Sequence, residues 1–232
     1  MSDYVKRYTL RQIVEHLCVM VLFILLAVTG FPQKFSEVSW SGWVIESLGG
    51  IDRSRWLHRS GGILFTVLVG FHLLTELFLV VSGRVRLSMV PKRKDFQDAV
   101  VMLRYYLGLS EEQARFDRYD YRQKFEYWGL ILGSMVMIAT GYILFYPLFV
   151  TLFLSGEVIP AAKMAHGSEG LLAFLVVITW HIFNAHLSPE VFPFDTSIFT
   201  GKISKERMEK EHPLEYARIP DDPGEEQSGA DA

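Results

Sequence analysis

The sequence predicts an all-α membrane protein built as a bundle of four transmembrane helices. Half of its 232 residues are hydrophobic, and they are concentrated in four long blocks with few charges. We expect membrane helices over about 10–31, 55–83, 123–153 and 160–187. Each block is close to the ~20 apolar residues that cross a ~30 Å hydrocarbon core. None alternates with a period of two residues, which excludes the strands of a membrane barrel.

Lys and Arg are distributed unevenly among the connections, and this predicts the orientation. The N-terminal segment, the connection between the second and third blocks, and the C-terminal region are rich in them, whereas the other two connections are poor. Both termini are therefore expected on the cytoplasmic side of the inner membrane of a prokaryote.

The long basic connection is expected to contain an interfacial helix over about 95–108. Phe96, Val100, Leu103 and Leu107 fall on one face of such a helix. An amphipathic helix of this kind lies in the plane of the membrane surface.

The predicted transmembrane domain covers residues 1–218. Residues 219–232 are acidic and contain Gly and Ser, which predicts a disordered tail. The formal net charge of −3 says little about partners, because the charges lie in loops and tails. We expect the lipid bilayer and no nucleic acid as a partner.

An internal repeat relates the two halves of the chain. The second and fourth blocks open with the same H-x-S-x-G pattern, beginning at His58 and His166. The preceding blocks both end in Thr-Gly-aromatic, as Thr29-Gly30-Phe31 and Thr140-Gly141-Tyr142. The chain therefore looks like two related helical hairpins, with His58 and His166 at matching depth on helices that run the same way.

Histidines inside membrane helices are costly and usually functional. Five lie in or at the edges of the blocks: His16, His58, His72, His166 and His181. His181 lies ~22 Å along the helix from His166 and within ~60° of the same face. One helix thus offers imidazoles near both membrane surfaces, and axial imidazoles on opposite sides of an iron are a common heme ligation. This pattern favours two hemes stacked across the bilayer.

The hemes are expected to be of b type, because no CxxCH attachment motif exists and Cys18 is the single cysteine. Six glycines would let a flat macrocycle approach the helix backbones: Gly61, Gly62, Gly70, Gly133, Gly167 and Gly170.

The ligands fall into an outer and an inner pair. His58 and His166 form the outer pair. His181 belongs to the inner pair, and its partner is either His16, at a similar distance from its helix end, or His72, its counterpart in the repeat. We favour His16 and leave His72 open. His186 is turned ~200° from His166 in an α-helix and is interpreted as an interfacial residue.

Other functions explain these histidines less well. Interhelical hydrogen bonding accounts for one histidine but not for several at paired depths. A zinc site requires closer ligand spacing. A heme-free membrane anchor would carry the histidines as relics, and a small transporter would show broken helices around a site at the bilayer midplane.

Several stretches carry a family resemblance: residues 12–30, 57–62, 123–141, 166–181, 201–202 and 212–216. Up to about residue 218 the chain resembles the b-type cytochrome subunit of membrane-bound formate dehydrogenases and nickel–iron hydrogenases, especially the gamma subunit of respiratory formate dehydrogenase. The resemblance implies heme ligands at His16, His58, His166 and His181. The chain departs from the family in two respects. The spacing between His166 and His181 in the fourth block is one residue longer than expected, and His72 is an additional histidine.

The resemblance also implies a quinone site beside the inner heme. The family's Asn-x-Gly-Gln stretch falls on residues 120–123, where Gln123 is retained and Asp120 is available to accept a hydrogen bond or proton. The substrate would be menaquinone or ubiquinone. The chain would then be an electron-transfer subunit, not an enzyme on its own, and its partner an iron–sulfur, multiheme cytochrome or dehydrogenase subunit.

Overall fold

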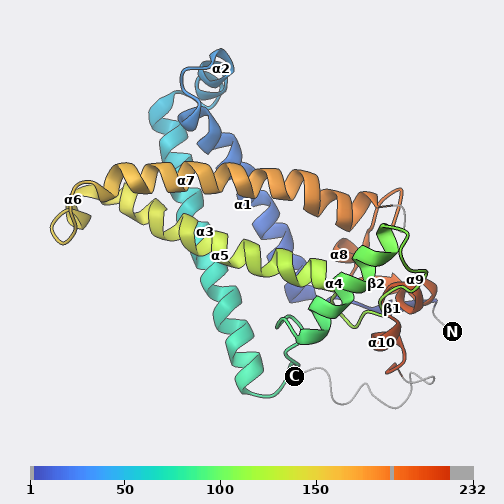
Figure 1. The fold of residues 1–232 in the computed structure, drawn as a ribbon. Helices are drawn as coiled ribbons and strands as arrows, with labels where there is room; N and C mark the ends of the chain where they lie inside the picture. Colours follow the sequence, from blue (N-terminus) through green and yellow to red (C-terminus); the bar gives the residue numbers. More distant parts are fainter. Residues whose placement is uncertain (1–2, 189–190, 220–232) are drawn as a thin grey trace. The chain divides into compact units, whose positions relative to one another are not determined.

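A computed structural model describes residues 3–188 and 191–219 (Figure 1). The elements run in the order β1 (Tyr4–Lys6), α1 (Leu10–Lys34), α2 (Ser39–Ser47), α3 (Ile51–Val81), α4 (Arg93–Tyr106), α5 (Tyr121–Phe145), α6 (Pro147–Val150), α7 (Val158–Leu175), the π-helical η1 (Val176–His181) and η2 (Phe183–Leu187), α8 (Ser197–Thr200), β2 (Lys202–Ser204), α9 (Lys205–Glu211) and α10 (Pro213–Tyr216). They form two compact units. The span unit contains residues 10–74 and 130–196, and the loop unit contains the described parts of 1–9, 75–129 and 197–232.

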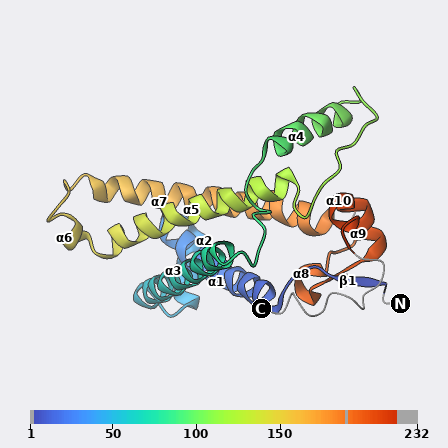
Figure 2. The ribbon, with the colours of Figure 1, turned by 90° about the horizontal axis from the view of Figure 1, so that it is seen from below.

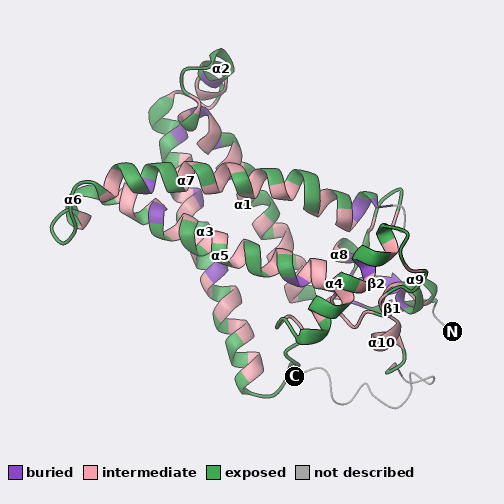
Figure 3. Cartoon of the chain, viewed as in Figure 1, coloured by how far each residue is buried: buried purple, intermediate pink, exposed green. Residues whose placement is uncertain are grey.

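Four helices are long and apolar enough to cross a membrane: Leu10–Lys34, Ile51–Val81, Tyr121–Phe145 and Val158–Leu187. Few of their side chains are buried within the protein (Figure 3). Val67, Leu132 and Leu172 are 63%, 63% and 55% exposed. Large apolar side chains exposed all around a helix suit a hydrocarbon solvent.

Close contacts hold the helices of the span unit together. Gly61 of α3 faces α1 so closely that an added Cβ would lie 3.2 Å from Leu25. Phe174 of α7 packs edge-on against Phe31 of α1, with ring centroids 4.9 Å apart, and parallel to Phe23. Helices α5 and α7 run side by side (Figures 1 and 2). Small residues at such interfaces are typical of membrane helix packing.

The second span begins earlier than the predicted residue 55. Gly49 and Gly50 have φ angles of 91° and 96°, and this turn ends α2 and allows α3 to begin at Ile51. The first turns of α3 are charged, so hydropathy alone does not detect them. Helix α2 itself, in the first outer connection, was not predicted.

Two further differences between the predicted and observed helix ends occur at prolines. The predicted span to residue 153 ends as α5 at Phe145, because the residue before Pro147 is disfavoured in the α conformation and Tyr146 has φ −121° and ψ 53°. Helix α1 instead continues through Pro32 to Lys34. Its last turn gains a bond from the Gln33 side-chain amide to the Thr29 carbonyl at 2.8 Å.

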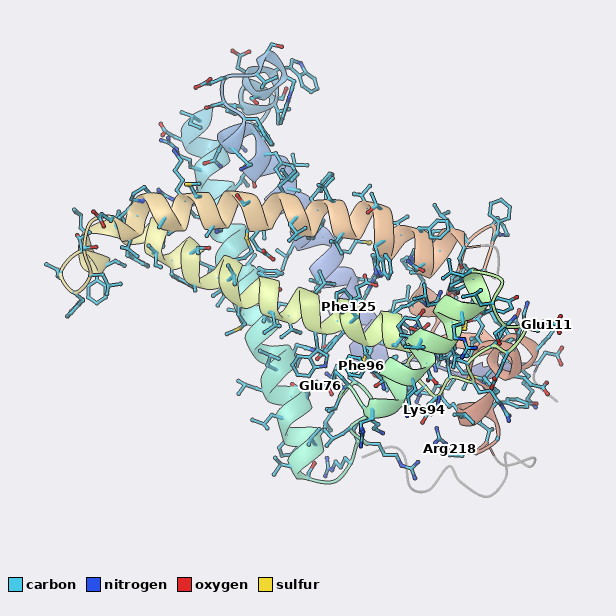
Figure 4. All side chains as sticks on the ribbon, in the orientation of Figure 1. Glu76, Lys94, Phe96, Glu111, Phe125 and Arg218 are labelled. Atoms are coloured by element: carbon cyan, nitrogen blue, oxygen red, sulfur yellow. The ribbon has the colours of Figure 1, made fainter. Side chains whose placement is uncertain are left out.

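Helix α4 of the loop unit presents one apolar face. Phe96, Val100, Leu103 and Leu107 are 72%, 57%, 58% and 63% exposed. Lys94 and Phe96 are labelled on this helix in Figure 4. Its placement at the membrane surface stays a prediction. The predicted tail of residues 219–232 lies outside the described residues except for Ile219.

A buried polar cluster ties three distant segments of the loop unit together. β1 pairs antiparallel with β2, with Val5 opposite Ile203. The Arg7 guanidinium binds the Glu215 carboxylate, and Arg118 donates to the same carboxylate at 2.7 Å. His212 is 5% exposed; its Nδ1 donates to the Asp117 carbonyl at 2.8 Å, and its Nε2 accepts from Arg7 at 3.1 Å. This neutral tautomer satisfies both ring nitrogens, so His212 has a structural role.

The cluster makes the stability of the loop unit depend on pH. Burial, and then the Arg7 charge, lowers the pKa of His212 to about 4. The unfolded chain binds this proton below about 6.5, so the free energy of unfolding falls by up to about 3 kcal/mol as the pH drops from about 6.5 to about 4. Above that window His212 is neutral in both states and contributes no pH dependence. Hydrogen exchange of residues 202–217, corrected for intrinsic rates, should accelerate across this window. His212→Asn should flatten the dependence; an unchanged dependence in that variant would contradict the assignment.

Candidate heme-binding site

The span unit brings His58 of α3 and His166 of α7 face to edge. Their ring centroids are 6.2 Å apart, with an interplanar angle of 81°. A metal–imidazole bond is about 2 Å long, and the ring centre lies roughly 1 Å beyond the nitrogen, so two axial imidazoles have centroids about 6 Å apart. The spacing therefore fits two ligands of one iron.

Each outer histidine is held by a threonine from the helix that precedes it. His58 Nδ1 lies 3.0 Å from Thr29 Oγ1, and His166 Nδ1 lies 2.9 Å from Thr140 Oγ1. With Nδ1 engaged in this way, Nε2 is the nitrogen left for a metal.

A glycine next to each threonine makes room for the imidazole. A Cβ at Gly30 would lie 2.9 Å from His58 Cε1, and one at Gly141 would lie 3.4 Å from His166 Cε1. A side chain at Gly30 would therefore displace the ring. The Thr-Gly pairs of the internal repeat thus seat the two histidines of that repeat.

The six glycines proposed to admit a macrocycle do not share one environment. An added Cβ would meet a side chain at Gly61, Gly133, Gly167 and Gly170, and nothing within 4 Å at Gly62 and Gly70. At Gly133 the neighbour is the carboxylate of Glu169. Side chains of neighbouring helices therefore pack against Gly61, Gly133, Gly167 and Gly170, where the sequence predicted the approach of a macrocycle.

His16 of α1 and His181 of η1 form a second pair. Their ring centroids are 6.1 Å apart, with an interplanar angle of 35°. His16 Nδ1 is buried and has no hydrogen-bond partner among the residues that the structure describes. A buried imidazole nitrogen without a partner is unusual, which marks His16 as a residue whose role is not to hydrogen-bond through Nδ1.

His72 has a different environment. Its Nδ1 lies 2.8 Å from Glu15 Oε2, and Glu15 also accepts from Arg11 at 2.8 Å. His72 thus belongs to a chain of polar contacts that includes Glu15, the residue before His16. His16 is a ring neighbour of His181, with centroids 6.1 Å apart.

The end of the fourth span is π-helical, which changes the expected orientation of His186. A π turn holds about one residue more than an α turn. His181 and His186 therefore come together, with ring centroids 6.3 Å apart and perpendicular planes. His186 is buried, donates from Nδ1 to the Asp195 carbonyl at 3.0 Å and stacks on Phe194. The predicted ~200° turn assumed α geometry and is wrong for this segment.

Comparison with known proteins identifies the family. The model of the prokaryotic cytochrome b561 family matches residues 7–191. The chain belongs to this family. It is 26% identical to the formate dehydrogenase cytochrome b556(fdo) subunit of Escherichia coli strain K12 over 217 residues, covering 94% of each chain.

The cytochrome b561 chain has further relatives of the same kind. It is 23% identical to the nitrate-inducible formate dehydrogenase cytochrome b556(Fdn) subunit of Escherichia coli strain K12 over 204 residues, covering 88% of this chain and 86% of the relative. The corresponding subunit of Shigella flexneri matches equally. The family implies heme b, and together with four apolar helices it makes the chain a multi-pass membrane protein of electron transport.

In this cytochrome b561 chain, His58 and His166 form one pair, and His181 at the second site lies 6.1 Å from His16 and 6.3 Å from His186. Within residues 3–188 and 191–219, no group of three or more His, Cys, Asp or Glu side chains could hold a metal ion. Paired imidazoles are the donor set of a heme, whose porphyrin supplies the remaining ligands.

The two predicted quinone contacts form a capping box at the start of α5. Gln123 N–H donates to Asp120 Oδ1 at 2.8 Å, and Asp120 N–H donates to Gln123 Oε1 at 3.2 Å. Asp120 Oδ2 also accepts from Arg122 at 2.8 Å. This reciprocal arrangement stabilises the helix N-terminus, so both residues have a structural role that sequence reasoning missed.

Sequence reasoning also missed Thr29, Thr140 and Glu15 as neighbours of the histidines. The Thr-Gly pairs were visible as part of the internal repeat, so a signal for two of them existed. No pattern in the sequence pairs Glu15 with His72, which lies 57 residues away.

Proposed function

We propose that the chain binds two b hemes and carries electrons across the membrane between a partner redox subunit and a quinone. The observation that supports this most strongly is the presence of two histidine pairs with ring centroids 6.2 and 6.1 Å apart. Bound heme supplies one-electron redox chemistry; the protein holds and orients it.

In this proposal His58 and His166 hold the outer heme, and His16 and His181 hold the inner heme. His166 and His181 lie on one continuous helix, about 20 Å apart along its axis. The two ligand pairs therefore span much of the hydrocarbon thickness. The ring-centroid distance of 6.1 Å between His16 and His181 supports His16 as the inner ligand, and His72 stays the alternative.

The proposed orientation keeps both termini and the basic connection containing α4 in the cytoplasm, in the inner membrane of a prokaryote. The partner would be a dehydrogenase or iron–sulfur subunit at the outer face, or a multiheme cytochrome there. The names of the relatives as formate dehydrogenase subunits support the first of these.

We retain Gln123 and Asp120 as the proposed quinone contacts on the cytoplasmic side. The quinone is menaquinone or ubiquinone. In the capping box, Gln123 uses its carbonyl oxygen, and its amide group is a hydrogen donor of the kind that a quinone carbonyl accepts.

Electron transfer to quinone can be tested directly. The purified protein is reduced with dithionite under anaerobic conditions, freed of reductant, and mixed with an oxidised menaquinone or ubiquinone analogue. Rapid loss of the ferrous heme absorption is expected with at least one of them, and oxidation by ferricyanide serves as the control. Hemes that ferricyanide oxidises but neither quinone does would contradict quinone reactivity.

Gln123 variants separate capping from quinone binding. Gln123→Glu keeps an acceptor for the Asp120 N–H but removes the amide donor, whereas Gln123→Ala removes both. Loss of one hydrogen bond to quinone costs about 1 kcal/mol, so reoxidation by quinone should slow at least about fivefold in both variants, with heme content unchanged. Slowing in the Ala variant alone would assign Gln123 to capping, and normal kinetics in a Gln123→Ala, Asp120→Ala double variant would place the quinone elsewhere.

A further inference from the structure

We infer that Thr29 and Thr140 are positioning residues for the outer pair of histidines and lower the reduction potential of the heme they hold. The inference rests on the proposed heme ligation by His58 and His166. Each threonine lies on the helix preceding its histidine, and the two Oγ1–Nδ1 distances are 3.0 and 2.9 Å. The same arrangement thus occurs once in each half of the internal repeat.

The direction of these hydrogen bonds follows from the other contacts of the hydroxyls. Thr29 Oγ1 lies 2.6 Å from the Leu25 carbonyl, and Thr140 Oγ1 lies 2.7 Å from the Val136 carbonyl. A carbonyl oxygen only accepts, and a hydroxyl has a single hydrogen to donate. Each threonine therefore gives its hydrogen to its own helix and accepts the hydrogen on the histidine Nδ1. It shares this hydrogen with a backbone carbonyl of the same helix, that of Leu26 for His58 and that of Met137 for His166.

Two consequences follow for a bound metal. With Nδ1 protonated, each ring is fixed in the tautomer whose Nε2 lone pair is available for iron. A histidine that donates from its second nitrogen is also a more basic ligand. A more basic ligand stabilises ferric over ferrous heme, so both threonines should lower the potential.

His16 of the inner pair lacks this arrangement, because its buried Nδ1 has no hydrogen-bond partner within residues 3–188 and 191–219. The threonines therefore distinguish the outer heme from the inner heme. The lower potential that they give the outer heme would favour electron flow from the outer toward the inner side.

The experiment compares Thr29→Val and Thr140→Val, which keep the shape of the side chain and remove the hydroxyl, with the corresponding Ser variants, which keep the hydroxyl. Thr66→Val is the matched control, because the Thr66 hydroxyl also donates to a carbonyl of its own helix, that of Gly62 at 2.8 Å, and makes no hydrogen bond to a histidine in the described part of the chain. Heme content, redox titration of each heme, and low-temperature electron paramagnetic resonance are measured on the full chain.

Each Val variant should shift the reduction equilibrium of one heme about tenfold toward the ferrous form, which is about 59 mV for one electron. That heme should be the one removed by His58→Ala, and its low-spin resonance should shift as well. The Ser variants and Thr66→Val should resemble the unmodified protein. Loss of the outer heme in the Val variants with retention in the Ser variants would equally show that the hydroxyl positions the ligand.

Unchanged potentials in both Val variants, an equal shift of both hemes, or loss of heme in the Ser variants as well would overturn the inference. These outcomes differ from a failure of the proposed function, in which the unmodified protein would contain no bis-histidine heme to titrate.

Discussion

Replacing His58 with Ala and replacing His166 with Ala should each remove the same heme and leave the other in place. The two ring centroids lie 6.2 Å apart, and equivalent Thr-Gly pairs contact the two rings. An iron that loses one of its two protein ligands binds far more weakly, and a noncovalent heme is then lost during purification. Heme content should fall from about two per chain to about one in both variants.

Redox titration identifies the missing component. His58→Ala and His166→Ala should lose one and the same wave, while His72→Ala, on the same helix as His58, serves as the control and should keep both. Loss of different waves in the two variants would show that these histidines do not share an iron.

Replacing His16 with Ala should abolish the inner heme, whereas His72→Ala should leave that heme low-spin with a shifted potential. His16 is the ring neighbour of His181 at 6.1 Å, while His72 is engaged with Glu15 next to His16 in the sequence. Loss of His72 changes the charge distribution around the inner pair but removes no ligand in this arrangement.

Electron paramagnetic resonance separates the two alternatives. A high-spin signal, or loss of the inner low-spin signal, is expected for His16→Ala alone. If His72→Ala alone converts the inner heme to high-spin, His72 is the ligand and the assignment of His16 is wrong.

The four spans could be predicted from sequence because a helix in lipid must be apolar for its whole length, and such blocks are visible in any hydropathy profile. The ends were harder to predict. Ile51 begins a helix in charged residues outside the apolar block, and Pro32 lies inside a helix although proline usually ends one.

The pairing of the histidines was predictable as far as regular helix geometry applies. Equal depth on helices that run the same way predicts that His58 and His166 lie close together, and their ring centroids are 6.2 Å apart. The π-helical stretch before His181 was not predictable from periodicity. A π turn contains about one residue more than an α turn. It therefore accommodates the residue by which the His166–His181 spacing exceeds the family pattern.

Contacts between side chains of different helices could not be predicted, because they depend on how the helices face one another. Three kinds of contact join residues that are far apart in the sequence. They are the hydrogen bonds that His58 and His166 make with Thr29 and Thr140, the contact of His72 with Glu15, and the ion pair of Arg7 with Glu215. The capping box of Asp120 and Gln123 was different, since its D-x-x-Q spacing at a helix start was visible in the sequence.

The central claim is that the two histidine pairs hold two noncovalent hemes, and pyridine hemochrome quantification of the purified full chain tests it most directly. A b-type spectrum with close to two hemes per chain is the expected result. A value near zero, or the spectrum of a covalently attached heme, would contradict the assignment of both pairs.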